Sequence, residues 1–147
     1  MGGEKDARSE RTRSDEGGIM GIKRDPADIA FSNAVRMARG HTCEHCASED
    51  RQMHLAHIFG RRAKSVRWDT LNGLCLCSYC HREFTENPLD FEKWLRDYVG
   101  QGYLDILNEK RRVTFKTTKT IRSEIARHYR QQIKLMELGP HDLVSYQ

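Results

Sequence analysis

The chain has 147 residues, and its 25 Lys and Arg against 21 Asp and Glu give a formal net charge of +4. This length fits one domain, and a hydrophobic share of only 37% makes an ordinary apolar core small for such a chain. No apolar stretch is long enough to span a bilayer, and the first residues are polar rather than those of a secretory signal. We expect a soluble, cytoplasmic protein without a membrane partner, its core supplemented by a metal or a second subunit.

The first half of the chain predicts an arm, a helix and a short strand. Residues 1–24 hold five glycines, six basic and five acidic residues, a composition typical of a disordered arm. The dipeptide Asp25-Pro26 is a helix start, and Gly40 predicts the end of that helix. In the region of cysteines and histidines that follows, residues 53–58 are predicted as a strand and Gly60 as a turn.

The second half predicts three helices. Apolar spacing after Pro88 predicts an amphipathic helix that ends at Gly100, and a shorter helix is expected around Leu104 and Leu107. From Lys119 to Leu138 one apolar stripe recurs at helical spacing, formed by Ile121, Ile125, Tyr129, Ile133 and Met136. We therefore divide the chain into an arm (1–24), a core with leading and following helices (25–100), a basic helical extension (101–138) and a tail (139–147).

Four of the five cysteines form two pairs with the spacing of a zinc site. Cys43 and Cys46, like Cys77 and Cys80, have two residues between them, so that each pair can direct two thiolates toward one tetrahedral ion. The alternative is four unrelated buried thiols. Cys75 lies outside both pairs and is interpreted as a small buried residue. His41 and His45 are competing ligands by position, but four cysteines already complete a closed structural site, so we interpret both as loop residues.

Three residues between and after these pairs have the spacing of a nuclease motif. His57 is followed by 14 residues and Asn72, and Asn72 by eight residues and His81. This pattern resembles the HNH endonuclease motif, which implies an α+β fold: a ββα-metal core within a zinc-binding treble clef, flanked by helices. The resemblance implies that His57 is the general base, that Asn72 braces the loop and orients the imidazole, and that His81 binds the catalytic metal.

The chain differs from the usual motif at two positions. Ala56 stands where many HNH enzymes have an Asp or His, and Thr85 where some have a further His. His54 is a candidate second ligand, although ideal strand periodicity places it on the face opposite His57, so that a bend is required. The alternatives are a His54 that touches phosphate or nothing, and a His57 and His81 that only pack or bind a second zinc.

Residues 25–138 also resemble the NinG/Rap recombination proteins of lambda-type phages. The likeness lies in Asp28 to Ser32, Val35-Arg36, Ala56-His57, Val66 to Asp69 and Asn72. That resemblance implies a structure-specific endonuclease for branched DNA, including Holliday junctions, which uses Mg²⁺ or Mn²⁺ beside the structural Zn²⁺. It would act in the cytoplasm of the bacterial host if the chain is phage-encoded. The alternatives are a non-specific or site-specific nicking HNH enzyme and a DNA-binding protein with a decayed active site.

Two basic segments are candidate DNA contacts. Arg61, Arg62, Lys64 and Arg67 follow the proposed base closely and would contact the phosphates beside the scissile bond. Nine basic residues and one acid lie between Lys110 and Lys134, with Arg127, Arg130 and Lys134 on the polar face of the last predicted helix. The alternative is a solvated helix face. The apolar stripe of that helix is a candidate homodimer interface, because resolving a junction requires two cuts.

Overall fold

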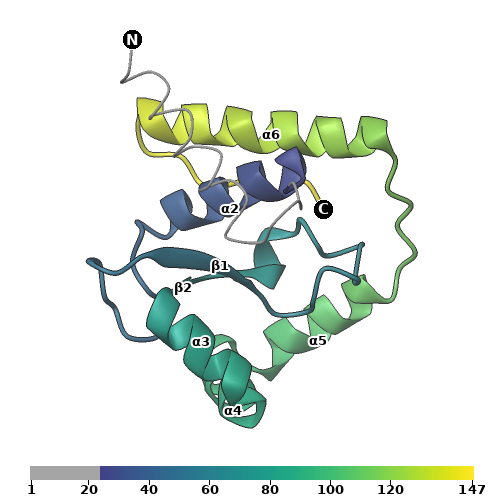
Figure 1. Cartoon of the computed structure of the whole chain (residues 1–147). Coiled ribbons are helices and arrows are strands. Elements are labelled where there is room, and N and C mark those ends of the chain that lie inside the picture. Colours follow the sequence, from purple (N-terminus) through teal and green to yellow (C-terminus); the bar gives the residue numbers. More distant parts are fainter. Residues whose placement is uncertain (1–23) are drawn as a thin grey trace, which may run out of the picture.

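The computed structural model describes residues 24–147 and shows an α+β fold built around one small hairpin (Figure 1). In chain order the elements are α2 (Pro26–Ala38), β1 (Met53–His57), the 3-10 turn η1 (Thr70–Asn72), β2 (Gly73–Cys77), α3 (Ser78–Glu86), α4 (Pro88–Val99), α5 (Gln101–Arg111) and α6 (Lys119–Leu138). The helices α2 and α6 lie side by side on one side of the hairpin, and α3, α4 and α5 lie on the other. The predicted arm falls outside the described residues, apart from Arg24.

The leading helix begins and ends where the sequence predicts. The side chain of Asp25 caps α2 by accepting a hydrogen bond from the backbone N–H of Ala27 at 2.8 Å, and Pro26 occupies the first turn. After Ala38 the chain reverses through Gly40, which has a φ of 66° that glycine adopts without strain. One face of α2 is fully buried, and this face packs against both α6 and the hairpin.

The long C-terminal helix uses its apolar stripe inside the molecule. Ile125 and Tyr129 are fully buried against Ala30 and Phe31 of α2, and the other stripe residues pack at the edge of the same cluster. The stripe is therefore covered within the chain, which removes the sequence-based reason for a homodimer along it. The polar face carries Arg127, Arg130 and Lys134, all exposed as expected.

The hairpin is the centre of the fold. The strands β1 and β2 pair antiparallel, with His54 opposite Leu76 and His57 opposite Gly73. Every residue of β2 is buried. A Cβ at Gly73 would lie 3.0 Å from Leu55 and 3.3 Å from Phe31, so only glycine lets α2 approach the hairpin this closely.

The second layer of helices covers the other face of the hairpin. Leu95 of α4 packs with the hairpin residues Met53, Ala56 and Leu76. The predicted end of α4 is confirmed at Gly100, which has a φ of 84°, and the expected short helix follows as α5. None of the helices within residues 24–147 is long and apolar enough to cross a bilayer.

Candidate functional site

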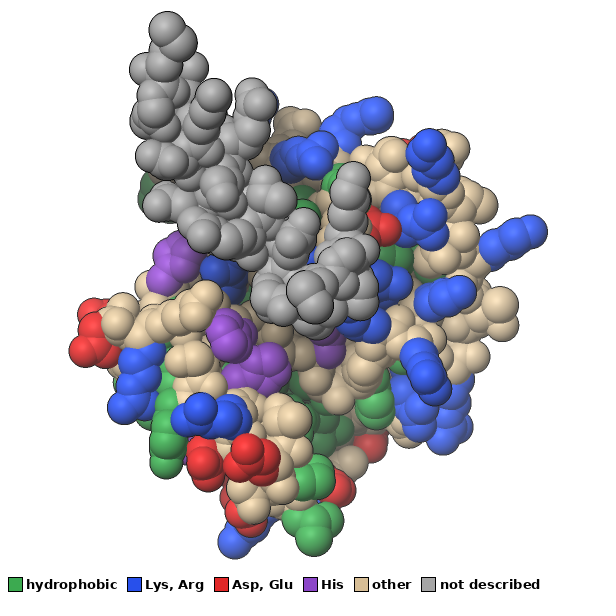
Figure 2. All heavy atoms as spheres, viewed as in Figure 1, with side chains coloured by type: hydrophobic (Ala, Val, Ile, Leu, Met, Phe, Trp, Pro, Cys, Tyr) green, Lys and Arg blue, Asp and Glu red, His purple; other side chains and the backbone are tan. Residues whose placement is uncertain are grey.

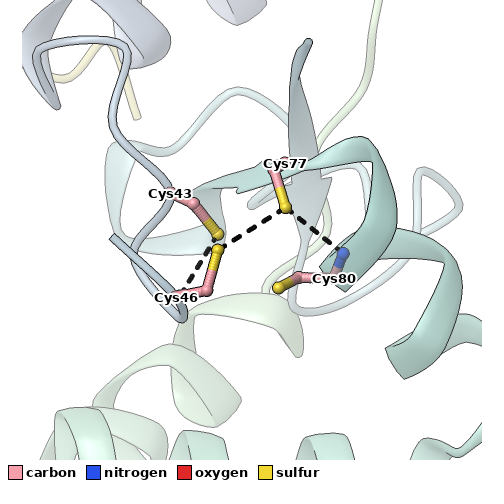
Figure 3. Close-up of side chains that lie close together, drawn as sticks. All are labelled: Cys43, Cys46, Cys77 and Cys80. Atoms are coloured by element: carbon pink, nitrogen blue, oxygen red, sulfur yellow. Dashed lines mark hydrogen bonds between the residues drawn. The ribbon is translucent and has the colours of Figure 1, made fainter. Parts of the chain in front are cut away.

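The two cysteine pairs converge on one point (Figure 3). The Sγ atoms of Cys43, Cys46, Cys77 and Cys80 all lie within 4.8 Å of one another, and those of Cys46 and Cys77 are 3.7 Å apart. A tetrahedral Zn²⁺ with bonds of about 2.3 Å separates its sulfur ligands by about 3.8 Å. The cluster therefore has the composition and dimensions of a structural zinc site, as the spacing predicted.

Hydrogen bonds favour the thiolate form of Cys77 in this cluster, whereas burial and hydrogen bonds from the neighbouring thiols raise the pKa of Cys80. Backbone N–H groups of Cys46 and Cys80 donate to the Sγ atoms of Cys43 and Cys77, at 3.5 and 3.4 Å. Burial raises the pKa of Cys77, but donors from the Cys80 backbone and from Arg51 outweigh it and bring that pKa to about 6. The Cys77 sulfur is therefore prepared for a cation before any metal binds.

The remaining candidates around the cluster take the places expected of them. Cys75 is fully buried outside the cluster, and burial raises its pKa to about 11, as for an inert core thiol. His41 is exposed. His45 is also exposed, but its Nδ1 lies 3.2 Å from Cys80 Sγ and its ring meets Phe84 and Trp94 edge to face. His45 is thus a neighbour of the cysteine cluster.

Two further histidines face each other beside the hairpin. His54 projects from β1 and His81 from the first turn of α3, and their Nδ1 atoms are 3.0 Å apart. Burial lowers the pKa of both imidazoles, assisted by Arg36 for His54 and by His54 for His81. Both rings therefore tend to be neutral at pH 7, the form in which an imidazole binds a metal.

His57 lies at the end of β1 and is held by the loop between the strands. Its Nε2 is 3.1 Å from the backbone oxygen of Arg67, and its ring stacks on Phe31 with centroids 6.1 Å apart. Because a carbonyl only accepts hydrogen bonds, Nε2 carries the proton and Nδ1 keeps its lone pair. Burial lowers the pKa of His57, so the ring is a neutral base, and its Nδ1 has no hydrogen-bond partner within residues 24–147.

Asn72 closes the loop that contains Arg67, whose backbone carbonyl holds His57. Its side chain is fully buried, accepts a hydrogen bond from the backbone N–H of Phe59 at 2.7 Å and donates one to the backbone oxygen of Phe59 at 2.9 Å. The two ends of the loop, residues 58–72, are thereby tied together. Asn72 is not bonded to His57, so it orients the imidazole only through the loop.

The three histidines line one cleft of about 590 Å³. His54 and His57 both line it, although ideal strand periodicity places them on opposite faces of β1. The opposite wall comes from α2 and from Arg24, two residues before it, and includes Asp28, Ser32 and Arg36. Figure 2 shows the histidine side chains gathered on this face between basic ones.

The sequence did not predict that Asp28, Ser32 and Arg36 of α2 line the cleft. Asp28 is 7% exposed and lies on the same helical face as Phe31 and Val35, at spacings of three and seven residues. An acid within a buried helix face requires a charged or hydrogen-bonding partner, and this was the signal available in the sequence.

The predicted DNA contacts near the loop separate into two kinds. Arg62 and Lys64 are exposed. Arg61 and Arg67 both pair with Asp28, and Arg67 keeps only 16% of its side chain exposed. Arg67 therefore has an internal role, and of the four it is the least accessible to a phosphate.

The basic residues of α6 lie away from the cleft. Figure 1 shows α2 between α6 and the hairpin, in agreement with the packing of α2 against both. A DNA strand that reached Arg127, Arg130 and Lys134 would do so at a distance from the histidines. Comparisons of the chain with protein-family models, with curated proteins and with solved structures find no match.

Proposed function

We propose that the protein is a metal-dependent HNH-type endonuclease that hydrolyses phosphodiester bonds in DNA. The single observation that carries the proposal is the convergence of three differently held histidines in one cleft: His57 with a free Nδ1, and His54 with His81 as a facing pair. Hydrolysis of a phosphodiester needs a base for the attacking water and stabilisation of the charge on the phosphate and the leaving oxygen. The cleft offers residues for both requirements.

The base in this proposal is Nδ1 of His57. The Arg67 carbonyl fixes the proton on the other nitrogen, so the free lone pair can take a proton from water without a change of tautomer. His54 and His81 would hold the catalytic metal, which would stabilise the phosphoryl oxygens and the departing 3′ oxygen. Two imidazole ligands fit Mn²⁺ better than Mg²⁺, which prefers oxygen ligands.

The charge of the cleft supports an anionic substrate. Arg24, Arg36 and Arg61 line it, and its acid, Asp28, is already paired with Arg61 and Arg67. Arg36 is half-buried and its hydrogen bonds go to the neutral groups Ser32 and Asn33. The guanidinium of Arg36 would repel a metal ion bound by His54 and His81 unless an anion lay between the two positive charges. A substrate phosphate would supply that anion.

The structural zinc site supports the geometry of the proposed metal ligands. Cys77 ends β2 and caps α3, and His81 follows Cys80 directly. A zinc ion bound to these cysteines would fix the angle between the hairpin and α3. It would thereby fix the distance between His54 on the strand and His81 on the helix.

The substrate class within this proposal is branched DNA, such as a Holliday junction, and it rests on the resemblance to the NinG/Rap recombination proteins. A nicking HNH enzyme without branch preference is the first alternative. A DNA-binding protein with a decayed active site is the second. The hydrogen bonds that hold His57 and Asn72 in place are present, which supports an intact site over a decayed one.

The test is cleavage by the zinc-loaded protein with Mn²⁺ or Mg²⁺ on four substrates: a Holliday junction, a flap, a single strand and a linear duplex. We expect cleavage, with the junction or flap cut fastest, and its loss in His57→Ala and His81→Ala with DNA binding retained. His41→Asn is the matched control, because His41 is exposed and its φ of 51° suits asparagine. Equal cutting of all four substrates contradicts the branch preference, and full activity of His57→Ala contradicts the mechanism.

A further inference from the structure

Asp28 is the buried acid to which the loop between β1 and β2 is anchored. Its Oδ1 accepts hydrogen bonds from Arg67 Nε and Trp68 Nε1, each at 3.0 Å, and its Oδ2 accepts from the guanidinium groups of Arg61, at 2.9 Å, and Arg67. Burial raises the pKa of Asp28, but the bonds and charges of Arg67 and Arg61 outweigh it and hold that pKa below its usual value. The carboxylate is therefore ionised and fully occupied.

The same arginine links Asp28 to His57. The guanidinium of Arg67 is held along one edge by the fork of hydrogen bonds to Asp28 and on one face by the ring of Trp68, whose centroid lies 4.6 Å from its Cζ. Trp68 itself is fully buried. With its side chain fixed in this way, Arg67 has little freedom to move its backbone carbonyl, which accepts the Nε2 proton of His57.

We infer that Asp28 is a positioning residue that sets the tautomer and orientation of His57 through Arg67. The catalytic consequence of this inference rests on the proposed function, but the effect on the imidazole does not. The arrangement is a relay across three elements: an acid on α2, an arginine in the loop, and the imidazole on β1. Partners of this kind, one shell outside a reacting group, commonly change activity by about 10- to 100-fold when removed.

The charges around His57 predict a second effect of Asp28, on the pKa of the imidazole. Burial lowers the pKa of His57, the hydrogen bond to the Arg67 carbonyl and the charge of Asp28 raise it, and the charges of Arg61 and Arg67 lower it. His81 and His54 line the same cleft. Replacing Asp28 by asparagine removes the anion and leaves both arginines, so the imidazolium form loses its one favourable charge and keeps only the hydrogen bond to the Arg67 carbonyl. The pKa of His57 should therefore fall further in Asp28→Asn.

The experiment is a nitrogen-15 NMR titration of the histidine rings in the zinc-loaded full chain, combined with cleavage rates against pH. In the native protein we expect His57 neutral with its proton on Nε2. In Asp28→Asn we expect a mixture of both neutral tautomers, a lower His57 pKa and cleavage slower by about 10- to 100-fold. The acid limb of the rate profile should move to lower pH, which a loss of folded protein alone would not cause.

The matched control is Asp25→Asn, the same change on the same helix. Asp25 caps α2 and pairs with Arg122 at 3.2 Å but does not touch the loop, and asparagine is an equally good cap. We expect the tautomer and pKa of His57 to stay native in this variant. If Asp28→Asn does not fold, Arg67→Lys keeps the charge and removes the fork, and we expect the same mixed tautomers.

An unchanged tautomer and pKa of His57 in folded Asp28→Asn overturns the inference, as does an unchanged tautomer in Arg67→Lys where that variant replaces it. This result does not depend on cleavage. A native protein that cuts no DNA contradicts the proposed function, while the NMR titration still decides whether Asp28 positions His57.

Discussion

Replacing Asn72 with alanine should lower the free energy of unfolding substantially, although only the side-chain amide is removed. The variant loses both hydrogen bonds to Phe59, and no other side chain of the described part of the chain is bonded to those backbone groups. Each lost bond costs about 1 to 1.5 kcal/mol when the partner stays partly buried, as half-buried Phe59 does. We therefore expect a loss of about 2 to 3 kcal/mol, or roughly 6 to 10 °C in melting temperature for a chain of this size.

Thermal unfolding of the zinc-loaded protein, followed by tryptophan fluorescence, measures this loss. The signal is suitable because Trp68 lies in the loop that Asn72 closes and is fully buried. Asn87→Ala is the matched control: its exposed side chain makes one hydrogen bond, to the Glu83 oxygen at 2.9 Å, and we expect a loss below about 1 kcal/mol. A loss for Asn72→Ala no larger than that of the control would refute the assignment of Asn72 as the loop closure.

Three other predictions concern the metal, the hairpin and pH. Cys80→Ser should lose its bound zinc and unfold, whereas Cys75→Ser should keep one zinc per chain by atomic absorption, because structural zinc binding is largely folding energy. Gly73→Ala should cost about 1 to 3 kcal/mol in denaturant melts, since the added methyl meets Leu55 at 3.0 Å; a neutral result would contradict this packing. Cleavage should rise with pH through the lowered pKa of His57 and be half-maximal below pH 6.5, because the base acts unprotonated; a midpoint above pH 6.5 would argue against His57 as the base.

The segment predicted as a tail has a defined place in the structure. Gln147 donates to the Lys64 backbone oxygen and accepts from the backbone N–H of Trp68, at 2.9 and 2.8 Å, and Ser145 accepts from the backbone N–H of Thr70. The loop that positions His57 is thus held from both ends of the described chain, by Asp28 on α2 and by residues after α6. The basic extension and the core form one packed unit.

Sequence reasoning was sufficient for features whose geometry is local. The ends of α2 and α4 follow from Pro26, Gly40 and Gly100, because a proline or a left-handed glycine changes the backbone at its own position. The cysteine cluster follows from two short spacings, because a knuckle of four residues can aim its thiolates in few ways. The choice of His57 and Asn72 rested on a resemblance in spacing, and no comparison bears on it.

The tertiary structure alone decided which distant residues meet. Periodicity shows that Asp28 lies on the buried face of a helix, but not that Arg67, 39 residues away, supplies its countercharge. It shows the stripe of α6, but not that α2 rather than a second subunit covers it. His54 and His81 meet because β2 carries the chain back beside β1 and the cysteine cluster then directs α3 across the hairpin. Amphipathic patterns give each element an inner face, and only packing selects the partner of that face.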